Sequence, residues 1–89
     1  MNMEQVIDFK KYSKSIKNRC KNCGKFLESP WFLAQLAISN FSVVSICAEC
    51  FKCSKCGKIE ESEVYYHKDG EGYYYFFCKT CCKIECLKQ

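Results

Sequence analysis

Cysteine is the residue type in this chain with the clearest chemistry, because most of its copies stand in pairs with one spacing. The chain has 89 residues, of which 10 are cysteines. A C-x2-C pair points two thiolates at one tetrahedral ion, and two pairs complete a closed zinc site with no vacant position. The chain contains four such pairs, Cys20/Cys23, Cys47/Cys50, Cys53/Cys56 and Cys78/Cys81. The spacing therefore predicts two structural zinc sites, with Cys82 and Cys86 left over.

The four pairs can share two ions in sequential order or in crossed order, in which the first and third pairs meet at one ion. The segments 20–26 (CKNCGKF) and 53–59 (CSKCGKI) both consist of C-x2-C-G-K and an apolar residue, and their glycines permit a positive φ. In each case another pair follows, after 23 and 21 residues, and this duplication favours sequential order. The predicted metal ligands are Cys20, Cys23, Cys47 and Cys50 at site 1, and Cys53, Cys56, Cys78 and Cys81 at site 2, with Cys82 as the alternative to Cys81.

Length and composition limit the class of protein. A chain of 89 residues buries too little apolar surface to fold with much margin, so it needs a cross-link such as a metal ion. Residues 1–19 lack the apolar core and cleavage site of a signal peptide. The apolar run 30–46 is interrupted by polar residues and is shorter than the ~20 residues of a membrane span. We expect an intracellular protein, cytoplasmic or nuclear, with reduced thiols and no membrane contact.

The formal net charge of +4 suggests a nucleic-acid partner at first sight. Ligating cysteines are deprotonated, however, so a zinc ion held by four thiolates carries a net charge of about −2. Two such sites bring the total close to zero, and many of the cations lie within a few residues of a cysteine pair. We expect most of them to be local counter-charges, and the alternative is that some form a partner surface.

The pattern from Cys20 to Cys81 resembles the LIM domain, a double zinc-binding domain. Phe51 and Lys52 fill the family's "CFxC" spacer, and both long spacers have lengths that the family permits. Two features depart from the family pattern. Cys47 stands where the family normally has histidine. The segment 28–38 (ESPWFLAQLAI) has helix-favouring features where the family has hairpins. A short helix over residues 29–38 is therefore an open alternative. The resemblance implies two Zn²⁺ ions and adaptor or scaffold work without catalysis.

The elements that must position these ligands follow from local patterns. Val6, Phe9, Tyr12 and Ile16 have helical spacing and predict a basic helical arm over residues 1–19. Apolar runs at 64–66 and 73–77 flank a turn signal and predict a β-hairpin, and the tail 80–89 suits a short helix. The predicted fold is a small zinc-stabilised domain, with a LIM-like double zinc-binding domain over 20–89. It has two sequential treble-clef or zinc-ribbon-like modules with short β-hairpins, the N-terminal helical arm and a short C-terminal helix.

Function follows from what the sites can do. There is no activated nucleophile with a base and no phosphate-binding glycine loop, so we expect no enzyme activity and no small-molecule substrate. The first hypothesis is an interaction module with a protein partner. The alternative is a small structural or regulatory subunit of a ribonucleoprotein, such as the ribosome, or of a transcription complex. A RING-type ubiquitin ligase is disfavoured because its C-x-H and C-P-x-C features are missing. The predicted partner-binding residues lie in the arm, at Lys10, Lys11, Lys14 and Lys17.

Overall fold

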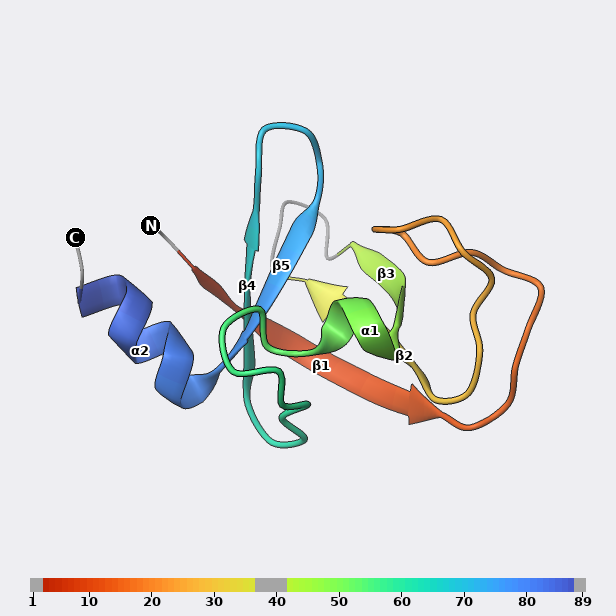
Figure 1. The fold of residues 1–89 in the computed structure, drawn as a ribbon, viewed down its shortest axis with the longest axis horizontal. Coiled ribbons are helices and arrows are strands. Elements are labelled where there is room, and N and C mark those ends of the chain that lie inside the picture. The colour runs from red at the N-terminus through yellow and green to blue at the C-terminus, as the bar shows by residue number, and fades with distance from the viewer. Residues whose placement is uncertain (1–2, 37–41, 88–89) are drawn as a thin grey trace.

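The computed structural model describes residues 3–36 and 42–87, and within them the chain forms one curled antiparallel sheet with two short helices (Figure 1). The strands lie in the order β3-β2-β1-β4-β5, so β3 and β5 are the two edges. The elements in chain order are β1 (Glu4–Tyr12), β2 (Trp31–Leu36), β3 (Val43–Cys47), α1 (Ala48–Phe51), β4 (Val64–Lys68), β5 (Tyr74–Cys78) and α2 (Lys79–Leu87).

The N-terminal segment is the central strand β1, so the predicted helical arm is wrong. A shift of register between Val6 and Asp8 places Val6 and Phe9 on the same face of the sheet, although they are three residues apart. Tyr12 lies on the opposite face, where it stacks on Trp31 with ring centroids 4.4 Å apart. The apolar residues of β1 are therefore three positions apart because of a β-bulge and because both faces of the strand make apolar contacts. Their spacing imitates that of a helix. The division of the chain at residue 19 stays a prediction.

The sequence allowed a short helix over residues 29–38, but this segment contains strand β2. Phe32, Ala34 and Leu36 are buried on one face, and Trp31 is buried on the other. The Trp31 indole N–H donates a hydrogen bond to the Lys14 carbonyl at 2.6 Å. Packing between β1 and β3 therefore outweighs the weak helical preference of single residues. Residues 37 and 38 lie outside the described part of the chain.

The predicted hairpin is confirmed as β4 and β5, which pair from Val64 opposite Cys78 to Lys68 opposite Tyr74. Its turn is held by Asp69, whose Oδ1 accepts hydrogen bonds from the backbone N–H groups of Glu71 and Tyr73, both at 2.9 Å. The Tyr73 bond is also the main reason why the Asp69 pKa lies below its usual value.

The predicted C-terminal helix is confirmed as α2, which follows directly after β5 and brings Cys81 and Cys82 back toward the hairpin. The side chain of Cys86 lies outside the described part of the structure. Of the two helices in the described ranges, neither has the length and apolar character that crossing a membrane requires.

Phe51 is the centre of the core, although it belongs to the two-residue spacer between the second and third cysteine pairs. Its ring stacks on Phe32 at 4.2 Å between centroids and lies 5.3 Å from Phe9 and 5.0 Å from Phe76. Its exposed fraction is 2%. These rings come from β1, β2, α1 and β5, so one side chain joins most of the sheet to the segment that carries the cysteines.

Replacing Phe51 with alanine should lower the free energy of unfolding by about 3–5 kcal/mol, because it removes the ring that four elements share. Urea denaturation of the metal-loaded protein measures this change. The control is Phe26→Ala, since Phe26 is 52% exposed and its removal should cost less than about 1 kcal/mol. Equal losses in the two variants would show that Phe51 is not the centre of the core.

Strands β1 and β4 pair over a short stretch, where Glu4 lies opposite Tyr66 and Gln5 opposite Tyr65. The Tyr66 hydroxyl donates a hydrogen bond to Glu4 Oε2 at 3.1 Å. Burial, and secondly this carboxylate, raise the pKa of Tyr66 to about 12. The folded protein therefore holds a proton that the unfolded chain releases at a pKa of about 10.

This difference predicts a loss of stability at alkaline pH. Below pH 10 both states carry the proton and the contribution is complete, whereas between pH 10 and 12 the unfolded state ionises first and is favoured. Between pH 8 and pH 11 the wild type should lose about 1 kcal/mol more unfolding free energy than Tyr66→Phe. Urea denaturation of both proteins at the two pH values measures this loss. Parallel losses would refute the assignment to Tyr66.

Candidate metal centres

The first cysteine pair lies on a tight turn that its sequence specifies. The Gly24 N–H donates a hydrogen bond to the Cys20 carbonyl at 3.0 Å, and the Cys20 N–H donates to the Lys25 carbonyl at 2.9 Å. Gly24 has a φ of 78°, in the left-handed region that glycine adopts without strain. We call this turn, residues 20–25, the first knuckle.

The third pair lies on a turn of the same geometry. The Gly57 N–H donates to the Cys53 carbonyl at 2.9 Å, and the Cys53 N–H donates to the Lys58 carbonyl at 2.8 Å. Gly57 also has a φ of 78°. The repeat C-x2-C-G-K is therefore a structural repeat as well, and we call residues 53–58 the second knuckle.

Each knuckle meets a second pair of cysteines that regular elements supply. Cys47 ends β3 and Cys50 lies in α1, while Cys78 ends β5 and Cys81 lies in the first turn of α2. Within each group of four, all the sulfur atoms lie within 4.8 Å of one another. The groups are Cys20, Cys23, Cys47 and Cys50, and Cys53, Cys56, Cys78 and Cys81.

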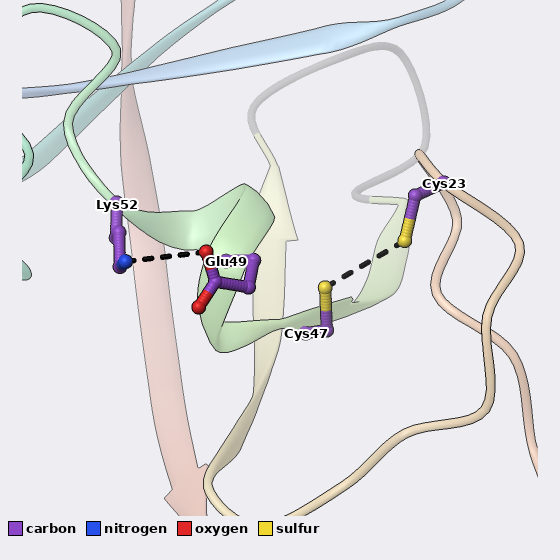
Figure 2. A network of polar contacts seen from close by, with 4 residues as sticks. All are labelled: Cys23, Cys47, Glu49 and Lys52. Atoms are coloured by element: carbon purple, nitrogen blue, oxygen red, sulfur yellow. Dashed lines mark hydrogen bonds and ion pairs between the residues drawn. The ribbon is translucent and has the colours of Figure 1, made fainter.

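The sulfur separations suit a tetrahedral ion. Figure 2 shows Cys23 and Cys47 pointing toward each other, with 3.7 Å between their sulfurs, and the same distance separates Cys56 from Cys78. Zinc–sulfur bonds of about 2.3 Å in a tetrahedron place the sulfurs roughly 3.8 Å apart, whereas a disulfide brings them to about 2.05 Å. Each group can therefore hold a metal ion, and it offers sulfur ligands alone.

Backbone hydrogen bonds favour the thiolate form of one cysteine in the first group. Burial disfavours the charged form of Cys20, but the backbone N–H groups of Cys23, Cys47 and Asn22 outweigh it and lower the pKa of Cys20 to about 7. Burial, and then the nearby Cys20 charge, raise the pKa of Cys50 well above its usual value. Without a cation, the thiolate of Cys20 therefore opposes ionisation of Cys50.

The second group repeats this arrangement. Burial opposes ionisation of Cys53, but the backbone N–H groups of Cys56, Cys78 and Lys55 lower its pKa to about 6. Burial, and then hydrogen bonding to neighbouring cysteines, raise the pKa of Cys81 to about 12. A divalent cation removes this conflict, because it favours the charged form of all four ligands.

Each group consists of two consecutive cysteine pairs, as the repeat indicated, and the pairs are not combined in the crossed order of a RING domain. The structure brings Cys81 into the second group. Cys82 is buried in the same cluster of side chains but is not a member of that group.

The four lysines predicted to bind a partner lie on β1 and the loop after it, where all four are exposed. Lys10 Nζ is 5.9 Å from the ring centroid of Tyr12. Lys11 forms an ion pair with Glu61 at 3.5 Å, and both side chains are more than half exposed, so the pair adds little stability. The structure does not gather Lys10, Lys11, Lys14 and Lys17 on a separate helix.

Sequence reasoning missed the residues that tie the knuckles to the sheet edges. The Asn22 side chain donates to the Tyr74 carbonyl at 2.7 Å and accepts from the Tyr74 N–H at 2.9 Å, which caps edge strand β5. In the second knuckle, the Ser54 N–H donates to the Phe76 carbonyl at 2.7 Å. Both residues occupy x positions of a C-x2-C pair, where the motif itself places no demand.

Comparison of the chain with models of protein families, with curated proteins and with solved structures found no match. The two groups of four cysteines are consistent with a double zinc-finger domain. No family is identified by these comparisons.

The Asn22 bonds predict a specific loss of stability. Asn22→Ala removes both bonds to Tyr74 and should lower the unfolding free energy by roughly 1–3 kcal/mol, while both metal ions remain bound. Urea denaturation and metal analysis measure the two effects. The matched control is Asn18→Ala. The backbone carbonyl of Asn18 accepts a hydrogen bond from the Leu27 N–H, and alanine keeps this carbonyl. The control should therefore change the unfolding free energy by less than about 0.5 kcal/mol. Identical behaviour of the two variants would contradict the capping role.

Proposed function

We propose that this chain is a non-catalytic protein-interaction module whose fold is held by two structural zinc ions. The observation that carries the proposal is the closed character of both groups. Each brings four sulfurs within 4.8 Å of one another, so a tetrahedral ion has all its positions filled by protein. A catalytic zinc site keeps a position for water or substrate, and these groups offer none.

Bound zinc would supply folding free energy and rigidity, because its ligands come from segments far apart in the sequence. In the first group, Cys20 and Cys23 would be held to Cys47 and Cys50; in the second, Cys53 and Cys56 to Cys78 and Cys81. Their order along the chain, with the "CFxC" spacer between the groups, also supports the adaptor role that the resemblance to the LIM domain implies.

The surface supports a protein partner better than a small-molecule substrate. Several large apolar side chains stay exposed on this rigid frame, including Phe26 at 52%, Val43 at 54% and Tyr75 at 37%. They lie directly after the first knuckle, on an edge strand and on the hairpin, and apolar surface of this kind is available for docking. The ribonucleoprotein alternative would rely instead on Lys10, Lys11, Lys14 and Lys17, which extend from a sheet strand into the following loop.

Metal removal tests the structural role of zinc. The purified protein should contain two zinc ions per chain, and excess chelator should abolish its strand signal in circular dichroism, because ligation and folding are one equilibrium. Zinc should restore the signal. An unchanged spectrum after complete loss of metal would refute a structural role.

Single substitutions test the ligand set. Cys81→Ser should reduce the zinc content from two ions to one, because a serine hydroxyl is a poor replacement for a thiolate at zinc. Cys82→Ser is the matched control, since this neighbouring cysteine is buried in the same cluster but stands outside the group of four. Loss of zinc in Cys82→Ser with retention in Cys81→Ser would reverse the assignment.

Affinity purification of the tagged full chain from its native cell, with and without nuclease, tests the class of partner. We expect a protein partner that survives nuclease and binds the zinc-loaded chain again when both are purified. A partner set that disappears with nuclease would favour the ribonucleoprotein role.

A further inference from the structure

The two edges of the sheet are treated differently, and the difference points to a binding site. Strand β5 is covered, because Asn22 bonds both backbone groups of Tyr74 and Ser54 bonds the carbonyl of Phe76. An exposed strand edge offers a row of backbone donors and acceptors to any extended chain. The knuckles therefore close one edge, and the opposite edge, β3, has to be considered separately.

Strand β3 keeps part of its edge open. The Ser45 carbonyl accepts a hydrogen bond from the Lys21 N–H at 2.9 Å, so it points away from β2. In an antiparallel pair the N–H and C=O of one residue point to the same side, and every second residue repeats this direction. The backbone groups of Val43 therefore also point outward, and they have no partner among the described residues.

A groove of about 520 Å³ runs along this edge. It is lined by residues 42–45, by Lys68 and Tyr74 of the hairpin, and by Asn18, Arg19 and Lys21 in and before the first knuckle. Within residues 3–36 and 42–87, no acidic side chain lines the groove. Three cations from two separate segments thus line a groove beside strand β3.

These cations are available to a ligand. The Arg19 guanidinium is held in place by the Gly24 carbonyl, at 2.8 Å, and by the Phe26 ring, 4.2 Å from its centroid. Lys68 Nζ lies 5.6 Å from the centroid of the Tyr74 ring. Neither of these residues nor Lys21 forms an ion pair with an acidic side chain in the described ranges.

We propose that this groove binds an extended acidic peptide segment as an added strand on β3. Backbone pairing at Val43 would provide the alignment, because the Ser45 carbonyl already accepts the Lys21 N–H, and carboxylates of the peptide would meet Arg19, Lys21 and Lys68. Residues 42–45, of which 43–45 belong to β3, line the groove, so a segment of roughly four to six residues spans it. The inference rests on the proposed function, because it names the class of partner that the interaction module takes.

The groove favours a peptide over a nucleic acid. Single-stranded nucleic acids bind through stacking of bases on exposed aromatic rings as well as through phosphate contacts. Among the described residues, the aromatic residue that lines this groove is Tyr74, whose exposed fraction is 3%. The exposed apolar side chain of Val43 and the outward backbone groups of β3 match a peptide, whereas a phosphate backbone uses the cations alone.

Fluorescence anisotropy with the zinc-loaded full chain tests the proposal. The probe is a labelled peptide of sequence Glu-Val-Glu-Val-Glu-Val, compared with Lys-Val-Lys-Val-Lys-Val and with the acidic peptide N-methylated at alternate residues. We expect the acidic peptide to bind, and the basic and N-methylated peptides to bind at least about tenfold more weakly, because charge and backbone pairing are both required.

Variants locate the site on the protein. The double variant Lys21→Glu, Lys68→Glu should weaken the acidic peptide at least about tenfold, while the charge-matched control Lys14→Glu, Lys83→Glu should bind as the wild type does. Val43→Pro removes one outward N–H without changing charge, which an edge strand tolerates, and it should also weaken binding. Zinc content and circular dichroism verify that each variant is folded, and the N-methylated peptide tests backbone pairing even if Val43→Pro fails to fold.

Three outcomes would overturn the proposal: no binding of the acidic peptide, equal binding of its N-methylated form, or tighter competition by oligouridylate at the same lysines. The last result would assign the groove to nucleic acid. Failure of the groove is distinguishable from failure of the proposed function. If Lys21→Glu, Lys68→Glu still retains nuclease-resistant protein partners, the chain is an interaction module that uses another surface.

Discussion

The structure depends on one electrostatic constraint, which is that four thiolates cannot share a few ångströms of space without a cation. Backbone N–H groups hold the pKa of Cys20 and of Cys53 at about 7 and about 6, so each group begins with one favoured thiolate. Burial, and then the neighbouring cysteines, raise the pKa of Cys50 and of Cys81 above its usual value. A divalent ion turns this mutual repulsion into attraction, and the same four residues then cross-link the chain.

Metal cross-links at the two groups would act on the sheet, because each knuckle also contacts a strand edge. The first knuckle reaches β3 through the Lys21 N–H and β5 through Asn22, and the second reaches β5 through Ser54. Between the two groups, the spacer places Phe51 in the middle of the aromatic core. Metal ligation, edge capping and core packing therefore involve the same short segments, so losing one is expected to weaken the others. This arrangement also leaves β3 as the edge with outward groups still open.

The sequence was informative where one interaction determines local structure. The C-x2-C-G-K repeat predicts a positive φ at Gly24 and Gly57, and the turn residues around Asp69 predict the hairpin. The sequence was misleading where tertiary contacts determine the local structure. Val6, Phe9 and Tyr12 have helical spacing only because a bulge and two-sided packing act together. Asn22 could not be recognised at all, because its partner Tyr74 is remote in sequence and the motif permits any residue at its position.

The most direct test of the account is to determine which cysteines share an ion. Cadmium-113 substitution allows each metal signal in an NMR spectrum to be correlated with the β-protons of its own ligands. The account predicts two cadmium signals, one coupled to Cys20, Cys23, Cys47 and Cys50 and the other to Cys53, Cys56, Cys78 and Cys81. A single signal, or a signal that couples Cys20 and Cys23 with Cys53 and Cys56, would contradict it.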